Sequence, residues 1–184
     1  MRIITGSARG LKLKTPKSLD IRPTSDRVKE SVFNIIGGKV SGAVVADLFA
    51  GTGNLGLEAL SRGASKAIFT DNSFTSLKLA KANANLAKLT AKAEFYRMDA
   101  TVALDAFRKK GLGFDLIFCD PPYNRGLVMS VLVQIDYGGI LLPDGLIVVE
   151  HSRHEPILSE LSTLCQVRVE RYGETVISFL TRDI

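Results

Sequence analysis

The chain has 184 residues, a formal net charge of +5 and two cysteines. This length fits a single domain that buries about two-thirds of its unfolded surface, so neither a disulfide nor a structural metal is needed for stability. No apolar run reaches the length of a signal peptide core or a membrane span, and Cys119 and Cys165 match no zinc or redox spacing. We therefore expect a soluble, cytoplasmic protein with buried, reduced thiols.

The positive charge is concentrated at the N-terminus. Residues 1–30 hold eight basic groups against three acids, whereas the rest of the chain has 16 of each. Counterion release favours binding of such a segment to a phosphate backbone. A solvated basic face without any partner is the alternative.

Residues 1–40 are expected to form a small extension. Apolar and polar residues alternate on both sides of a glycine-rich turn at residues 6–10, which predicts a β-hairpin with a basic polar face. Pro23 excludes a central strand, and Thr24 or Ser25 can cap a helix that ends at Gly37-Gly38.

Residues 41–184 are expected to form the main domain, in which short apolar runs alternate with amphipathic segments. Such runs predict a parallel sheet covered by helices on both faces, hence a doubly wound α/β fold. The predicted strands are 43–49, 67–70, 93–97, 114–119 and 146–150, followed by a terminal antiparallel hairpin of 167–171 and 175–180. The predicted helices are 55–62, 74–87, 100–110, 127–135 and 156–164.

The first strand of this domain runs into the glycine-rich loop Gly51-x-Gly53-x-x-Gly56. In doubly wound folds ligands bind here, because the start of the helix presents backbone N–H groups and glycine permits a close approach. Asp71 ends the second strand, near the position of a ribose-binding acid. The loop alone fits NAD as well as S-adenosylmethionine.

Asp47 favours S-adenosylmethionine, because a carboxylate just before the loop suits the cationic amino-acid end of that donor and repels a pyrophosphate. The alternative is that Asp47 only accepts hydrogen bonds from loop N–H groups. Asp99 ends the third strand, where it can recognise an adenine amino group, cap the next helix, or do both.

The most specific motif is Asp120-Pro121-Pro122-Tyr123, directly after the apolar strand 114–119. Two prolines stop the strand and fix the direction of the carboxylate and the first carbonyls. These acceptors can hold a base NH₂ so that its lone pair points at a sulfonium methyl, while Tyr123 stacks on the extruded base. An ordinary strand-terminating turn is the alternative; no metal is required.

His151 and His154 follow the next strand without a metal-binding arrangement. We interpret them as structural or rim residues, with His151 a weak candidate for substrate contact.

These motifs together resemble the RsmD-type 16S ribosomal RNA guanine-N2 methyltransferases of bacteria. The resemblance covers nearly the whole chain, in segments that start at residues 2, 22, 47, 56, 114 and 172. It implies a class I, Rossmann-like S-adenosylmethionine methyltransferase fold, with a seven-stranded, mostly parallel sheet that ends in an antiparallel hairpin. It also implies S-adenosylmethionine as donor and, as acceptor, a guanine amine of 16S rRNA, of the guanine 966 type, within the small ribosomal subunit or its assembly intermediate.

Carried over by position, the resemblance implies residues for catalysis and for the cofactor. The catalytic set is Asp120, Pro121, Pro122 and Tyr123; the cofactor set is Asp47, Phe49, Gly51, Gly53, Asp71, Asn72, Asp99, Ala100 and Asp120. Asp71 stands where a longer Glu is frequent, and the segment led by Arg22 lies over the cofactor in the family.

The candidates for RNA contact come from the positive charge and not from the resemblance. They are Arg2, Arg9, Lys12, Lys14, Arg22 and Arg125.

Three other functions remain open at this point. An NAD-dependent oxidoreductase would explain the glycine loop but not Asp120–Tyr123, and a non-catalytic RNA-binding module would explain the basic segment but not the cofactor loop. An adenine-N6 methyltransferase acting on DNA or another RNA would use the same turn. A monomer is adequate for each of these functions.

Overall fold

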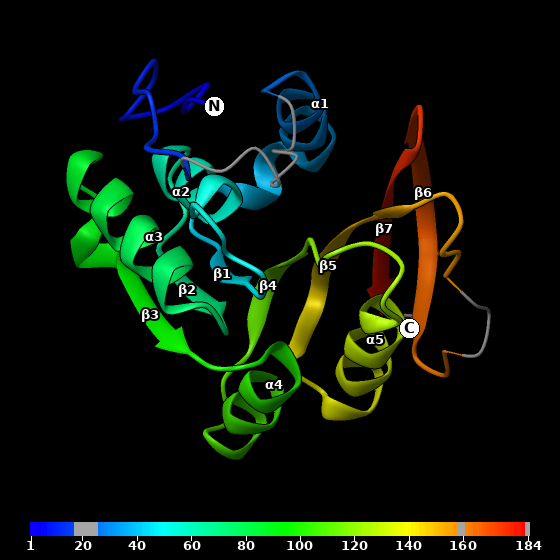
Figure 1. The fold of residues 1–184 in the computed structure, drawn as a ribbon. Coiled ribbons are helices and arrows are strands. Elements are labelled where there is room, and N and C mark those ends of the chain that lie inside the picture. Colours follow the sequence, from blue (N-terminus) through cyan, green and yellow to red (C-terminus); the bar gives the residue numbers. More distant parts are fainter. Residues whose placement is uncertain (17–25, 158–160, 183–184) are drawn as a thin grey trace.

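A computed structural model describes residues 1–16, 26–157 and 161–182. Its centre is one seven-stranded sheet in the order β3-β2-β1-β4-β5-β7-β6 (Figure 1). The first five strands along the chain run parallel, and β7 is antiparallel to both β5 and β6, as predicted. The strands are β1 (Val44–Asp47), β2 (Lys66–Asp71), β3 (Ala93–Arg97), β4 (Phe114–Cys119), β5 (Leu141–Ser152), β6 (Leu164–Tyr172) and β7 (Thr175–Arg182).

Helices cover both faces of the sheet, which explains why its central strands are almost wholly apolar. One buried cluster joins the sheet to α1, α2 and α3, and a second joins the opposite face to α4 and α5. The helices are α1 (Asp26–Ile36), α2 (Asn54–Ser61), α3 (Phe74–Leu86), α4 (Ala100–Lys109) and α5 (Leu127–Gly138), with short 3-10 turns η1 (Gly37–Val40) and η2 (Thr90–Lys92).

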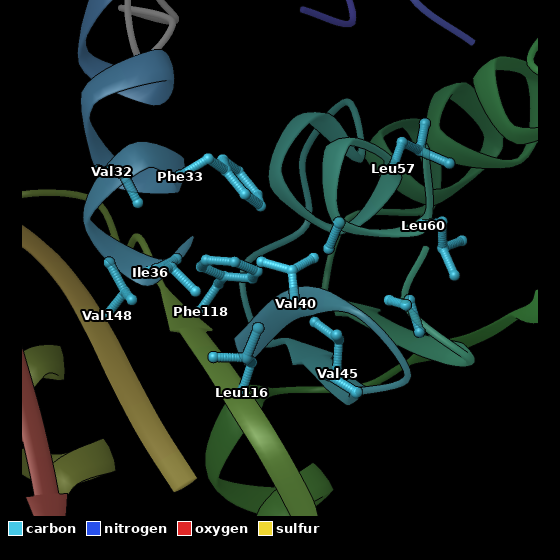
Figure 2. Close-up of a cluster of buried hydrophobic side chains, with 14 of the residues drawn as sticks. Val32, Phe33, Ile36, Val40, Val45, Leu57, Leu60, Leu116, Phe118 and Val148 are labelled. Carbon is cyan, nitrogen blue, oxygen red and sulfur yellow. The ribbon is translucent and has the colours of Figure 1, made fainter. Parts of the chain in front are cut away.

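Strand β4 shows how one apolar run serves both faces. Leu116 and Phe118 belong to the cluster beneath α1, whereas Ile117 and Cys119 belong to the opposite cluster. The Phe118 ring lies 5.6 Å from the ring of Phe33 in α1 (Figure 2). This alternation fixes which side chains at the end of the strand point towards α1.

Two sequence-based predictions need correction. Strand β5 begins at Leu141, five residues earlier than predicted, and passes through Asp144, which has a left-handed φ of 63°. The helix predicted over 156–164 is wrong for the residues of that range that are described; residues 158–160 lie outside them. The buried carboxylate of Asp136 accepts the N–H groups of Ser162 and Thr163 at 2.7 Å, which leads the chain directly into β6.

The N-terminal hairpin is present as a short ladder with an isolated bridge between Arg2 and Lys12. Ile3 N–H donates to the Leu11 carbonyl at 2.9 Å, and Ile3 is fully buried in the cluster beneath α1. The proposed helix caps Thr24 and Ser25 lie outside the described residues. The helix itself, α1, ends where Gly37 takes a positive φ of 58°, as the glycine pair predicted.

Buried polar groups fasten this hairpin to α2. The Glu58 carboxylate accepts the N–H groups of Ile4 at 2.8 Å and Thr5 at 3.1 Å. Gly6 crosses the end of α2 so closely that a Cβ there would lie 1.8 Å from the Ser61 carbonyl oxygen. Only glycine fits this crossing, which places the hairpin against the end of α2.

Candidate active site

A cavity of about 1030 Å³ lies at the carboxyl ends of β1, β2, β4 and β5. It is at the upper end of the roughly 300–1,000 Å³ typical of ligand pockets, so it has room for a cofactor and part of a second substrate. Eleven of the residues predicted from the sequence line it: Asp47, Phe49, Gly51, Asp71, Asn72, Asp99, Asp120, Pro121, Pro122, Tyr123 and Arg125.

The glycine-rich loop has its N–H groups bound by carboxylates of the protein. Asp71 Oδ2 accepts Gly51 N–H at 2.9 Å, and Asp47 Oδ2 accepts Gly56 N–H at 3.0 Å. A dinucleotide pyrophosphate would meet two acids here in place of two available donors. The geometry therefore disfavours NAD and suits a ligand with positive charge.

Asp47 is 2% exposed at the end of β1. Burial raises the pKa of its carboxyl to about 7, the hydrogen bond from Gly56 N–H opposes that rise, and neighbouring Asp71 adds to it. The bond from Gly56 N–H is the contact that the structural alternative for Asp47 expects. Direct contact with a donor amino group remains a prediction.

Asn54 is a lining residue that sequence reasoning missed. Its Oδ1 accepts a hydrogen bond from Lys29 Nζ at 2.7 Å, which orients the amide. Its Nδ2 is buried and finds no hydrogen-bond partner among the described residues. Since a buried donor without an acceptor costs about 1–3 kcal/mol, this atom fits a ligand carboxylate. Acids together with one amide donor suit the zwitterionic end of S-adenosylmethionine.

The remaining residues of the predicted cofactor set lie around the same loop. Asp99 caps α4 by accepting Thr101 N–H at 3.0 Å, as one interpretation of the sequence expects. It also lines the cavity, so its position is compatible with the predicted contact to an adenine amino group. Gly53 starts α2 with a φ of 78°, and Ala100 is buried in α4. Neither is part of the cavity lining, so their contact with a cofactor stays a prediction.

The Asp120–Tyr123 turn forms the wall of the cavity beside β5. Tyr123 is half-buried, and its hydroxyl donates to Glu150 Oε1 at 2.7 Å and lies 3.1 Å from Thr175 Oγ1. Burial and the Glu150 carboxylate raise the pKa of the phenol, so it stays protonated. The phenol ring is therefore held at a fixed angle beside the Asp120 carboxylate.

A second carboxylate holds the loop that follows Tyr123. Glu155 accepts Asn124 N–H and Gly126 N–H, both at 2.9 Å, and Asn124 has a left-handed φ of 58°. Arg125 between them is exposed and lines the cavity. No feature of the sequence distinguished Glu155 from other surface acids.

His151 is not at the site, so the weak prediction of substrate contact is wrong. It is 4% exposed, its Nε2 lies 2.8 Å from Ser178 Oγ, and its Nδ1 lies 3.0 Å from the Ser152 carbonyl oxygen. It points to the face of the sheet opposite Glu150 because neighbouring residues of a strand alternate.

The predicted RNA-binding residues lie on the hairpin next to the cavity. Arg2, Arg9, Lys12 and Lys14 are all exposed, and Arg2 is paired with Asp26 at 3.6 Å. None of them lines the cavity, but Met1, Thr15 and Pro16 of the same segment do. Arg22 lies outside the described residues. The basic segment therefore borders the cavity without filling it.

Two further findings concern metals and membranes. In residues 1–16, 26–157 and 161–182, no group of three or more His, Cys, Asp or Glu side chains is arranged to hold a metal ion. Across the same part of the chain, every helix is too short or too polar to span a bilayer.

The two cysteines differ in burial. Cys119 is buried as expected, whereas Cys165 is only partly buried.

The sheet order with its antiparallel β7 is that of the class I, Rossmann-like methyltransferase fold. The model of the family described as "Conserved hypothetical protein 95" matches residues 1–181. The chain belongs to this family, that of the RsmD-type methyltransferases.

Named relatives agree with this assignment. YlbH of Bacillus subtilis is 43% identical over 178 residues, 97% of each chain. Ribosomal RNA small subunit methyltransferase D of Escherichia coli is 40% identical over 151 residues, 82% of this chain and 74% of that protein. The solved structure of yhhF from Escherichia coli superposes with a TM-score of 0.87 at 33% identity, covering 100% of this chain and 98% of that one.

Proposed function

We propose that this protein transfers a methyl group from S-adenosylmethionine to the exocyclic N2 of a guanine in 16S rRNA, within the small ribosomal subunit or its assembly intermediate. The observation that carries the proposal is the Asp120–Tyr123 turn on the wall of a cavity whose other side is the acid-bound glycine loop. The name of the Escherichia coli relative supports the choice of small-subunit rRNA.

The protein's part in the reaction is to hold and orient. Asp47, Asp71, Asp99 and Asn54 line the side of the cavity where the donor would lie, and Asp120 lines the side of the base. When bound, the donor would supply an electrophilic methyl group. Transfer would form an N–C bond at the amine, leave the C–S electron pair on sulfur and release one proton from the amine.

Asp120 and the carbonyl of Pro121 would accept the two amine hydrogens, which directs the nitrogen lone pair at the methyl group. Tyr123, with its ring fixed through its hydroxyl, would stack on the extruded base and replace the stacking that the base had within the RNA. Asp120 is also the nearest candidate to receive the proton that the amine releases. The protein would act as a monomer, with Arg9, Lys12 and Lys14 on phosphates.

The deciding experiment is transfer of labelled methyl from S-adenosylmethionine to small-subunit rRNA and particles that lack the modification, followed by nucleoside analysis. N2-methylguanine is the expected product. Methyladenine would preserve the role of the turn and overturn the guanine assignment. Binding of NAD in place of S-adenosylmethionine would overturn the enzymatic proposal. An Asp120→Ala variant that keeps the full function of the protein in cells would also overturn it, in favour of a non-catalytic RNA-binding protein.

A further inference from the structure

Glu150 is a second carboxylate at the base side of the cavity, next to Asp120. In the parallel register of β4 and β5, Cys119 pairs with Val149, so Glu150 in β5 and Asp120, the first residue after β4, follow at the same level. Val148, two residues before Glu150, packs in the cluster beneath α1, so alternation along β5 places Glu150 on that face. Asp120 and Glu150 both line the cavity.

The position of the Glu150 carboxylate is fixed by its neighbours. The side chain is 9% exposed, and its Oε1 accepts the Tyr123 hydroxyl at 2.7 Å. Thr175 lies 3.1 Å from the same hydroxyl, so the phenol bridges β5 and β7. A carboxylate has about four acceptor positions and no donor, so it can accept from more than one group at the same time.

We infer that Glu150 is a specificity-determining residue that accepts the N1–H of the target base while Asp120 accepts its exocyclic amine. The inference rests on the proposed function and gives a physical reason for the preference for guanine over adenine. Guanine carries two adjacent donors, N1–H and the N2 amine, and two adjacent carboxylates match both. Adenine carries a lone pair on N1 beside its amine, so Glu150 would face that lone pair across a site with little water.

The test compares two bases that share the same reactive amine. 2-Aminopurine keeps the amine of guanine but has an acceptor at N1. The probe is a small-subunit particle reconstituted with 16S rRNA in which splinted ligation places 2-aminopurine at the guanine that the wild-type protein methylates. We expect wild-type kcat/KM to be about 100-fold lower for 2-aminopurine than for guanine, because the Glu150 carboxylate would then face the lone pair on N1 instead of an N–H donor. Equal rates on the two bases would overturn the inference without any variant.

Glu150→Gln isolates the residue. Its amide oxygen can still accept from Tyr123, while its NH₂ can donate to an acceptor at N1. We expect this variant to lose activity on guanine and gain it on 2-aminopurine, so that the ratio of kcat/KM values moves by about 100-fold towards 2-aminopurine. An unchanged ratio, with both rates lowered alike, would mean that Glu150 acts only through Tyr123 and would overturn the inference.

Tyr123→Phe is the matched control. It removes the hydroxyl from Glu150 and leaves the carboxylate, so both substrates should slow by the same factor and the ratio should stay at its wild-type value. A ratio that shifts as far in Tyr123→Phe as in Glu150→Gln would contradict a direct role for Glu150. Absence of any transfer by the wild-type protein to the guanine particle would instead refute the proposed function itself.

Discussion

Lys29 Nζ and Glu58 Oε2 lie 3.2 Å apart, and both side chains are fully buried. Lys29 also donates to the Arg2 carbonyl at 2.6 Å, and Glu58 also accepts from Arg62 Nε at 2.8 Å. Burial lowers the pKa of Lys29, whereas the Glu58 carboxylate acts in the opposite direction. This buried ion pair joins the N-terminal hairpin, α1 and α2.

Lys29→Met should lower the free energy of unfolding by about 3 kcal/mol. It removes the fully buried one of the two cations that pair with Glu58, and it takes the donor from the Arg2 carbonyl. Urea unfolding followed by circular dichroism measures this change. The matched control is Arg108→Ala, which breaks the exposed pair with Asp105 and should cost no more than roughly 1 kcal/mol. Similar losses in the two variants would show that the buried pair contributes no more than a surface pair.

Asp120→Ala should lower kcat by about 100-fold or more while the affinity for S-adenosylhomocysteine changes little, because the proposed main contact of the Asp120 carboxylate is with the base. Single-turnover transfer and isothermal titration calorimetry measure the two quantities separately. The control is Asp105→Ala in α4, an exposed acid far from the cavity lining, which should match the wild type. An equal loss of donor affinity in Asp120→Ala would reassign that carboxylate to donor binding.

Affinity for S-adenosylhomocysteine should tighten by roughly tenfold between pH 6 and 7.5, because Asp47, with a pKa of about 7, must ionise to face the ligand ammonium. Calorimetric titrations across this range give the affinity, and buffers of different ionisation enthalpy give the released proton. Asp47→Asn should bind weakly with little dependence on pH. A wild-type profile that is flat over this range would argue against contact between Asp47 and the ammonium.

Without ligand, Asp47 should make stability change with pH in the opposite sense. Its pKa is raised in the folded chain, so between about pH 4 and 7 the folded state holds a proton that the unfolded state has lost. The contribution of this residue therefore falls as pH rises through that window. Urea unfolding of the wild type and Asp47→Asn at pH 5 and 7.5 should show a difference between the two proteins that depends on pH.

Charge reversal at Arg9 and Lys12 should weaken RNA binding and reduce the salt slope by roughly one for each phosphate that the protein no longer neutralises. Filter binding of small-subunit rRNA from low to moderate salt provides the slope. Reversal of Arg108 and Lys109, both exposed at the end of α4, is the control with the same change in net charge. A slope that falls equally in both variants would indicate a general effect of charge.

The sequence predicted the fold well where one physical signal dominated. β4 and its turn were recognisable because an apolar run ended in two prolines. The first part of β5 was not, because Pro143, Asp144 and Gly145 are typical of turns. They form an irregular stretch between Leu141, which pairs with Phe114, and Leu146, which pairs with Leu116. The helix predicted over 156–164 failed because the contact with Asp136 lies far away in sequence.

The candidate site divides in the same way. Residues at fixed spacing, such as Asp47 and Asp120, were predicted because they belong to a local motif. Glu150, Thr175 and Asn54 were not, since their importance depends on strand register and on contacts across 25 or more residues. Glu150 gave no such signal, because its place beside Asp120 depends on the pairing of β5 with β4.

The carboxylates bound to the glycine-rich loop have a thermodynamic consequence. Gly51 N–H and Gly56 N–H are already satisfied by Asp71 and Asp47, so the loop has its final shape without help from a ligand. Ordering a loop on binding normally costs affinity. Here the loop would already be ordered in the folded protein, so binding of a donor would not include the free-energy cost of ordering it.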